Sequence, residues 1–349
     1  MTTFIDSGPK ADSNWRGIIL LGRNVQSYKF ALARSLLDFA AQDHDQAPLE
    51  ELAGPFSSYL CEHLRLSSKQ GTPSRSEFLD ACRRSNSGEV SRADLLATTV
   101  RLGFNNVLDA FHTVGRSTAS IKFFDVAGTG ENRVVHLTDA AMSLAIGSQS
   151  RNLRGEVEAR WRLVETAWDL GVSSNALATI AFDGQEQMLY IPERNRRRSI
   201  TGAREAISGY QKGTCFYCFR DIETDVAAGL PADVDHFIPH RLQWVLFEGK
   251  PNLDGVWNLV LACQECNRGV GGKSDSLPAP GHLERLWQRN EEYISSHHPL
   301  RETLIRQTGS SPDRRRRFLN EVWQTANPAG AHLWSPVQVA ASPFQASRP

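Results

Sequence analysis

Apolar residues recur at helical spacing over most of the N-terminal part of the chain. Val25, Tyr28, Leu32, Leu36 and Phe39 follow one another at intervals of three or four residues, which predicts a helix ending near residue 41. The same pattern predicts further helices over residues 56–66, 77–84, 94–102 and 107–111. We therefore expect residues 1–119 to form a helical N-terminal region.

One short apolar run and two polar residues of this region carry additional predictions. The run WRGIILLG at residues 15–22 is apolar and short, and its pattern predicts a buried strand or turn. Asn24 and Ser91 each precede an apolar-periodic segment, so both are expected to cap helices.

The period of the pattern changes near residue 120. IKFFDV and RVVHLT flank the turn sequence AGTGEN, which predicts a β-hairpin, and Asp183-Gly184 before QMLYI predicts a second one with a type I′ turn. Between them, Trp161 and Trp168 lie on one stripe of a long helix, as expected of a packing face. We expect residues 120–192 to form a small α/β module.

Helical spacing returns after residue 276. Leu283, Leu286 and Trp287 mark one helix, residues 300–307 a second, and Ser311-Pro312 begins a third. The last residues are rich in Pro, Ala and Ser. Residues 276–349 are therefore predicted to be a C-terminal helical region with a flexible tail.

Composition places the chain among ordinary globular proteins. It has 349 residues, of which 40% are hydrophobic and 22% charged, and its formal net charge is zero. No apolar run is long enough to span a bilayer and no signal-peptide pattern opens the sequence, so we expect a cytoplasmic protein without membrane contact. Basic residues cluster at 194–198 and 314–317; such clusters form solvated faces or contact phosphates.

The chemistry of the sequence is concentrated between residues 215 and 275. Four of the six cysteines form two CxxC pairs, Cys215 with Cys218 and Cys263 with Cys266, a spacing typical of one tetrahedral zinc site. A site with four thiolate ligands leaves no open position, so the zinc is expected to be structural. The two remaining cysteines, Cys61 and Cys82, are expected to be inert thiols.

Polar residues of a different kind lie between and beside the cysteine pairs. His236 is the residue type that titrates near neutrality and is the candidate general base. Asp235 and Asn267 offer the oxygen ligands that suit Mg²⁺ or Mn²⁺. Asn258 precedes the apolar run LVLA.

The segment contains, in this order, the dipeptides DH, WN and CN together with two CxxC pairs. In this arrangement it resembles the HNH endonucleases, the zinc-braced branch of the ββα-metal nucleases. The resemblance implies an HNH nuclease domain over residues 193–275 with two strands and a helix. It also implies a catalytic role for His236 as base, Asp235 and Asn267 as ligands of a catalytic Mg²⁺ or Mn²⁺, and Asn258 as the side chain that orients the histidine. The last motif position holds Asn in place of the family's usual His.

The resemblance also implies DNA as the partner. Arg268 and Lys273 resemble the basic residues that follow the last cysteine of the family and contact phosphate. Arg196, Arg197 and Arg198 precede the first cysteine pair and are further candidates for DNA contact. For Lys273, a solvated charge is an equally good interpretation.

The sequence therefore predicts an α+β protein, mostly helical, that carries a ββα-metal finger with a four-cysteine zinc site. The expected activity is metal-dependent DNA cleavage, and analogy with HNH nucleases favours a restriction or antiphage defence effector with a regulatory protein partner. The alternative is a non-catalytic zinc module that binds nucleic acid or protein. The motif covers only part of the chain, and the flanking regions match no known function.

Overall fold

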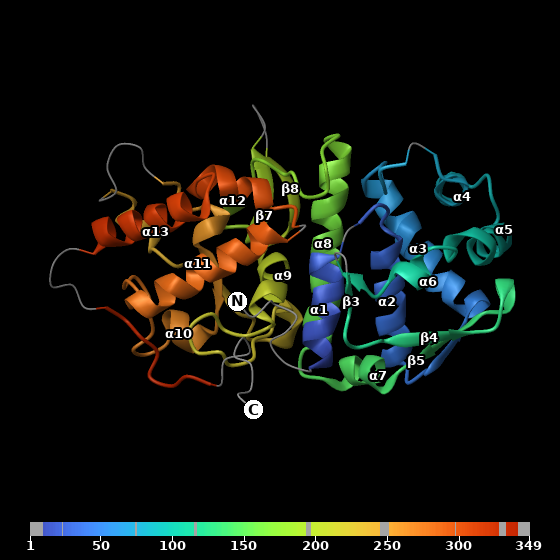
Figure 1. Ribbon diagram of the computed structural model, residues 1–349, viewed down its shortest axis with the longest axis horizontal. Coiled ribbons are helices and arrows are strands. Elements are labelled where there is room, and N and C mark those ends of the chain that lie inside the picture. Colours follow the sequence, from blue (N-terminus) through green and yellow to red (C-terminus); the bar gives the residue numbers. More distant parts are fainter. Residues whose placement is uncertain are drawn as a thin grey trace. The chain divides into compact units, whose positions relative to one another are not determined.

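The computed structural model divides into two compact units, an N-terminal unit over residues 8–172 and a C-terminal unit over residues 173–349 (Figure 1). The structure describes residues 10–22, 24–73, 75–114, 117–192, 197–244, 251–296, 298–327 and 333–340. Helices and small sheets both occur in these residues, which confirms the α+β class. The boundary between the units, after residue 172, falls within the α/β module predicted over residues 120–192. The four predicted regions stay a prediction.

The N-terminal unit is mainly helical. Its principal elements are α1 (Ala11–Leu21), α2 (Tyr28–Ala41), β1 (Gln46–Pro48), α3 (Leu49–Leu66), α4 (Glu77–Asn86), α5 (Arg92–Thr98), α6 (Val107–Ala110), β2 (Thr113–Val114), β3 (Ser117–Thr118), β4 (Phe124–Ala127), β5 (Val134–Leu137), α7 (Asp139–Ile146) and α8 (Ser150–Asp169). A π-helical segment, Thr99–Gly103, continues α5. The expected cap at Ser91 is confirmed, since its hydroxyl accepts from Asp94 N, whereas α2 begins after Ser27 and not after Asn24.

The predicted strand at residues 15–22 is wrong, because this run belongs to helix α1. A short apolar run cannot distinguish a buried helix from a buried strand by its pattern alone. Most sides of this helix are buried, and Arg16 is buried with them, at 1% exposure. Two hydrogen bonds from Arg16 to Glu156 of α8, at 2.8 and 3.0 Å, compensate the buried charge.

The hairpin predicted near residue 120 is confirmed. Strand β4 pairs antiparallel with β5, with Phe124 opposite Leu137, and β1 pairs with the other edge of β5. Phe111 and Phe123 pack their rings against Trp15, with centroids 5.6 and 5.1 Å from it. This aromatic cluster joins the sheet to α1 within the core of the N-terminal unit.

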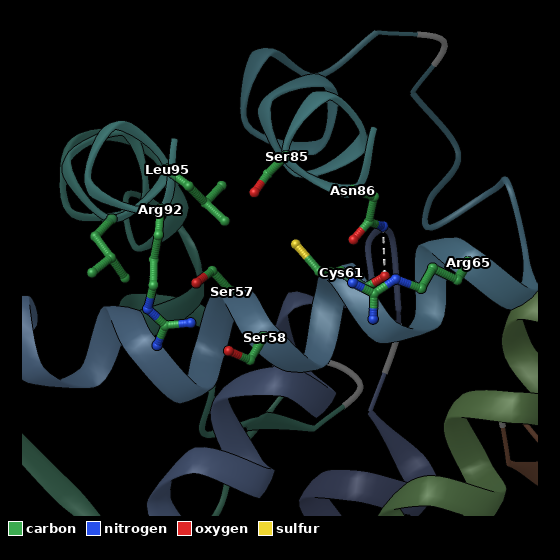
Figure 2. A pocket seen from close by; sticks show the side chains of 9 residues that line it. Ser57, Ser58, Cys61, Arg65, Ser85, Asn86, Arg92 and Leu95 are labelled. Atoms are coloured by element: carbon green, nitrogen blue, oxygen red, sulfur yellow. Dashed lines mark hydrogen bonds between the residues drawn. The ribbon is translucent and has the colours of Figure 1, made fainter. Parts of the chain in front are cut away.

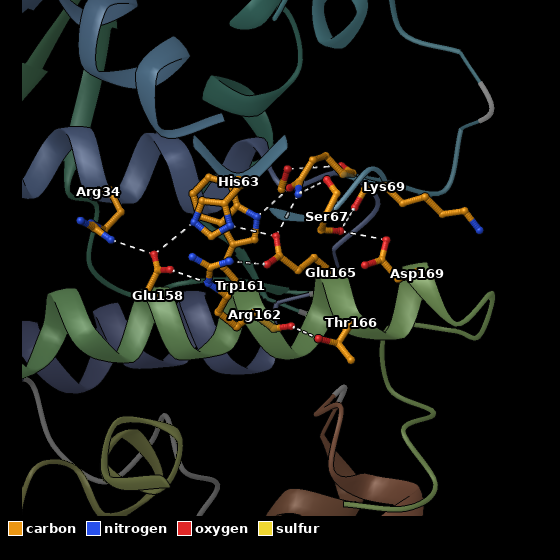
Figure 3. Close-up of polar contacts among 12 residues, drawn as sticks. Arg34, His63, Ser67, Lys69, Glu158, Trp161, Arg162, Glu165, Thr166 and Asp169 are labelled. Carbon is orange, nitrogen blue, oxygen red and sulfur yellow. Dashed lines mark hydrogen bonds and ion pairs between the residues drawn. The ribbon is translucent and has the colours of Figure 1, made fainter. Parts of the chain in front are cut away.

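The packing face predicted for α8 is also confirmed, since Trp161 is fully buried and Trp168 is 3% exposed. His63 of α3 stacks on Trp161 with ring centroids 3.5 Å apart. Its Nδ1 lies 2.8 Å from Glu165 Oε2 and its Nε2 lies 3.2 Å from Glu158 Oε2 (Figure 3). A buried imidazole therefore bridges two carboxylates of one helix.

The charges around His63 shift the pKa values of this cluster in opposite directions. Burial lowers the pKa of His63, but the bonds to Glu158 and Glu165 outweigh burial, and the pKa is raised above 6.5. Burial acts to raise the pKa of Glu158, yet His63 together with Arg162 and Arg34 lowers it to about 2. The cluster is thus built to hold a protonated histidine between ionised carboxylates.

The C-terminal unit contains three-stranded and two-stranded sheets covered by helices. Its elements are β6 (Ala181–Asp183), β7 (Met188–Pro192), β8 (Arg197–Gly202), α9 (Ala203–Ser208), β9 (Asp233–His236), β10 (Leu259–Ala262), α10 (Gln264–Arg268), α11 (Pro280–Ser295), α12 (Arg301–Thr308) and α13 (Pro312–Ala326). The three helices predicted after residue 276 are confirmed, and the Ser311 hydroxyl caps α13 by accepting from Arg314 N.

The second predicted hairpin forms, but with a different turn. Strands β6 and β7 pair with Asp183 opposite Met188, which leaves a four-residue loop where the Asp-Gly pair predicted a two-residue turn. Asp183 Oδ1 accepts from the backbone nitrogens of Gln185 and Glu186, at 3.0 and 3.3 Å. The carboxylate therefore organises a longer loop, and Gln187 takes the left-handed conformation.

The segment predicted as a flexible tail includes residues 333–340, which are bonded to the rest of the C-terminal unit. Trp334 is 6% exposed, and its Nε1–H donates to Gly271 O at 2.8 Å. Ala340 N donates to Cys218 O at 2.8 Å. Residues 341–349 lie outside the described residues. Within the described chain, no helix combines the length and apolar character needed to cross a membrane.

A candidate four-cysteine metal centre and its neighbouring polar residues

The four predicted cysteines lie together in the C-terminal unit. The sulfur atoms of Cys215, Cys218, Cys263 and Cys266 are all within 4.8 Å of one another, and Cys218 Sγ is 3.7 Å from Cys263 Sγ. Two sulfurs at about 2.3 Å from one tetrahedral ion lie about 3.8 Å apart, so the spacing fits a metal such as zinc. Among the described residues, no other group of three or more His, Cys, Asp or Glu side chains converges in this way.

Backbone hydrogen bonds hold the two cysteine pairs in place. Cys215 N donates to Arg220 O at 2.8 Å, which closes the first pair into a tight loop. Phe216 N donates to Leu261 O of β10 at 2.9 Å and ties this loop to the strand that leads into the second pair. Cys263 then directly precedes α10, and Cys266 lies within it. Two segments 45 residues apart thus meet at one centre.

Strands β9 and β10 pair antiparallel beside this centre, with His236 opposite Leu259. The Nε2 of His236 lies 2.9 Å from Asp254 Oδ1. An ionised carboxylate only accepts hydrogen bonds, so the Nε2–H is the donor and Nδ1 remains as an acceptor. Burial lowers the pKa of His236 below its ordinary value despite the opposing effect of Asp254.

Asp254 also lies close to a second histidine. His240 Nε2 is 3.6 Å from Asp254 Oδ2, and the rings of His236 and His240 have centroids 5.6 Å apart. The side chains of His240 and Asp254 are 59% and 41% exposed, whereas that of His236 is 20% exposed. The three side chains form a polar cluster at the surface, with His236 on its inner side.

Asn258 connects the chain after β9 to the chain before β10. Its side chain is fully buried, and its Oδ1 accepts from Ile238 N at 2.8 Å. Its Nδ2 donates to Ile238 O at 3.0 Å and to Leu253 O at 2.9 Å. Ile238 and Leu253 lie close in sequence to His236 and Asp254, so one amide holds the two segments that carry the histidine and its carboxylate partner.

Asp235 points to the interior. It is 7% exposed; its Oδ2 accepts from the Tyr217 hydroxyl at 2.6 Å and its Oδ1 from Lys273 Nζ at 3.0 Å. Burial raises the pKa of Asp235, and the Lys273 ammonium and the Tyr217 hydroxyl oppose that rise. The carboxylate predicted to hold a cation thus already has two protein partners.

Lys273 is fully buried, and three oxygens surround its ammonium. In addition to Asp235 Oδ1, Nζ donates to His236 O at 2.9 Å and to Ser274 O at 3.3 Å. The ammonium joins the end of β9 to the loop after α10 and balances the Asp235 charge. Lys273 thus stabilises the interior of the unit. Its burial contradicts both predictions for this residue, a phosphate contact and a solvated charge.

Asn267 lies on α10 and bonds to Asp233, whereas Asp235 was the carboxylate predicted to share a cation with it. Its Nδ2 donates to Asp233 Oδ2 at 3.0 Å, and Arg268 Nε is 3.0 Å from the same oxygen. Among the described residues, no hydrogen bond joins Asn267 to Asp235. The Arg268 side chain is 62% exposed. Arg268 is thus paired with Asp233 at an exposed position, and its predicted phosphate contact stays a prediction.

The basic residues predicted before the first cysteine pair are described only in part. Arg196 lies outside the described residues. Arg197 opens β8, where only its backbone is described, and Arg198 follows it, half-buried. Their predicted DNA contacts stay predictions.

Sequence reasoning missed Asp233, Tyr217 and Asp254. Asp233 and Asp235 alternate along one strand, so their shared face was a signal for the first of these residues. Tyr217 lies between the cysteines of the first pair, where its position resembles spacer sequence. Asp254 lies 18 residues from His236, and no local pattern links the two.

Comparisons with protein-family models, with curated proteins and with solved structures each found no match for this chain.

Proposed function

We propose that the protein is a metal-dependent endonuclease that hydrolyses phosphodiester bonds in DNA. The observation that carries the proposal is the environment of His236. Its ring is held by Asp254 at 2.9 Å on an antiparallel strand pair that leads into α10 beside the four cysteines. A neutral imidazole with one nitrogen fixed as donor has the other available to take a proton from water.

The four cysteines are assigned to structural zinc. Four thiolates leave no ligand position for water or substrate, so the zinc braces the strands and α10 and takes no part in the reaction. The hydrogen bonds of Asn258 fix the chain on both sides of His236 and Asp254, which positions the proposed base.

A hard cation is assigned to the oxygen side chains around α10. Asn267 Oδ1, Asp233 and Asp235 fit Mg²⁺ or Mn²⁺ by type. When bound, such an ion stabilises the charge that develops on the phosphate oxygens. Asp233 is added to the two predicted ligands, Asp235 and Asn267, because it is the carboxylate that bonds to Asn267. Arg268, 62% exposed, is assigned to the phosphate backbone of DNA.

The ion pair between Lys273 and Asp235 favours a second candidate function. The ammonium neutralises the carboxylate at 3.0 Å, as expected in a protein that needs no cation at this position. In that case the zinc unit binds nucleic acid or a partner protein without cutting. A role as a restriction or antiphage defence effector with a regulatory partner rests on analogy alone.

Cleavage of supercoiled plasmid by the full chain tests the proposal. With Mg²⁺ or Mn²⁺ the protein is expected to convert the plasmid to nicked or linear DNA, and EDTA is expected to stop the reaction because the cation is removed. The outcome is measured by gel electrophoresis, with filter binding of the same DNA in parallel. DNA binding without cleavage under every metal condition would favour the second candidate function.

A further inference from the structure

The N-terminal unit contains a polar hollow of about 200 Å³ between α3, α4 and α5 (Figure 2). Serine hydroxyls, a thiol and two guanidinium groups line most of it. The lining residues are Ser57, Ser58, Cys61, Arg65, Ser85, Asn86, Arg92, Leu95 and Leu96. We propose that this hollow, here called the arginine pocket, binds a small anion of the phosphate class, a free phosphate or a phosphomonoester.

The charges of the lining favour an anion. Arg65 and Arg92 both line the pocket, and no carboxylate does. No hydrogen bond or ion pair is described for either guanidinium, although arginines of the neighbouring helix α4 are paired, such as Arg83 with Asp80 at 2.6 Å. Two cationic groups without an acidic partner, facing one hollow, favour an anion as occupant.

The neighbouring hollow on the same unit has the opposite balance. It lies against α4 and α5 and is lined by Glu77, Asp80, Glu89 and Asp94 in addition to two arginines. Its four carboxylates outnumber its two guanidiniums, so the lining of this second hollow is net negative. The excess of positive charge is particular to the arginine pocket and does not extend along the whole surface of these helices.

The neutral lining supplies the donors that an oxyanion requires. The hydroxyls of Ser58 and Ser85 carry no described bond, while Asn86 uses one amide hydrogen on Cys61 O at 2.8 Å and keeps the other. Figure 2 shows Ser57, Ser58 and Cys61 on one helix between the side chains of Arg65 and Arg92. Hydroxyl, amide and guanidinium donors from three helices thus meet at one place.

Size limits the class of ligand. Pockets for drug-sized molecules have volumes of about 300–1,000 Å³, above that of the arginine pocket. One water molecule takes about 30 Å³, so the pocket has the volume of about six waters. This space suits a phosphate group with a small organic part.

The test is the affinity of the full chain for two probes, inorganic phosphate and glycerol 3-phosphate, measured by isothermal titration calorimetry at low salt. The wild type is expected to bind at least one probe, and the preferred probe distinguishes a free phosphate from a phosphomonoester. Arg65→Gln and Arg92→Gln are each expected to weaken binding about tenfold or more, the loss of one charge-assisted interaction. Arg83→Gln is the matched control, because this arginine is exposed, paired with Asp80 and absent from the lining.

Ser58→Asp provides a second variant that does not depend on removing an arginine. Ser58 is exposed, so the change is tolerated by the fold, and the new carboxylate repels an anion and pairs with the guanidiniums. Binding is expected to disappear while the unfolding temperature stays that of the wild type. Absence of binding in the wild type would overturn the proposal, as would affinities for both arginine variants equal to the control. Since the readout is anion binding, the result is independent of DNA cleavage.

Discussion

At the scale of single residues, the hydrogen bond between His236 and Asp254 determines which ring nitrogen is available for chemistry. Asp254 accepts from Nε2 at 2.9 Å and leaves Nδ1 unprotonated in the neutral ring. Asp254 is thus a positioning residue, since it acts through the histidine. Its partial exposure shows that water reaches this side of the cluster.

Removal of this partner should slow cleavage without weakening substrate binding. Asp254→Ala is expected to lower kcat about tenfold to a hundredfold, part of the 10²–10⁴ that a general base contributes, with KM nearly unchanged. Asp254→Asn should retain more of the rate, because the amide oxygen still accepts from Nε2–H. Steady-state kinetics on a short duplex measure both variants. A rise in KM with kcat unchanged would instead assign Asp254 to DNA binding.

His63 leads to a prediction about pH. Its pKa is raised in the folded unit, so its stabilising effect is complete below the ordinary pKa of about 6.5 and is lost as pH rises through the raised value. The pKa of Glu158 is lowered, so its contribution is lost only as pH falls toward about 2. The cluster therefore stabilises the N-terminal unit most between about pH 4.5 and 6.5.

The free energy of unfolding lost in His63→Gln should accordingly be largest near pH 5.5 and shrink toward pH 9. A tenfold difference between the proton affinities of His63 in the folded and the unfolded chain changes the free energy of unfolding by about 1.4 kcal/mol. Urea titrations at several pH values measure the difference from wild type, with His44→Gln in the exposed segment between α2 and β1 as control. A difference that stayed constant over this pH range would show that His63 contributes by packing on Trp161 and not by charge.

At the scale of elements, the four cysteines join the loop before β9 to the start of α10. Loss of one cysteine should therefore loosen both the loop before β9 and the start of α10. Cys263→Ser is expected to lower the zinc content from one ion per chain and to destabilise the C-terminal unit by at least several kcal/mol, since zinc binding in finger peptides contributes about 10–16 kcal/mol. Elemental analysis and chemical denaturation measure the two effects.

Cys61→Ser is the control for this experiment, because its thiol lies in the N-terminal unit and outside the cysteine cluster. Its zinc content should equal that of the wild type. If chelation of the metal from the wild-type protein left its unfolding transition unchanged, the assignment of a structural zinc would fail.

The sequence allowed most of these elements to be predicted wherever periodicity was long or turn chemistry was strong. The β4–β5 hairpin and the three C-terminal helices follow from such patterns. The run at residues 15–22 did not reveal α1, since burial on all sides removes the polar stripe that marks a surface helix. The turn after Asp183 differs because the carboxylate bonds two residues ahead in a longer loop.

The candidate site was predictable to the extent that it is local in sequence. The spacing of the two CxxC pairs predicts that the four cysteines form one cluster, and the positions of their sulfur atoms confirm it. The partners of Asp235 and His236 come from positions 38 and 18 residues away, and only the folded path of the chain brings them together. Burial of Lys273 could not be predicted, because an isolated lysine among glycines is typical of exposed loops.

At the scale of the whole molecule, the two units carry different chemistry. All residues assigned to cleavage belong to the C-terminal unit, while the arginine pocket and the His63 cluster belong to the N-terminal unit. The sequence contains a recognisable motif only in the C-terminal unit. The N-terminal unit has no such motif, and its proposed ligand follows from side chains that three separate helices bring together.

The most direct test of the central claim is the rate of plasmid cleavage by His236→Ala beside the wild type. The variant is expected to cut at least about a hundredfold more slowly, because general base catalysis contributes about 10²–10⁴. Its zinc content and unfolding transition should match the wild type, and His136→Ala in the N-terminal unit should cut normally. Cleavage by His236→Ala at the wild-type rate would contradict the assignment of His236 as the base.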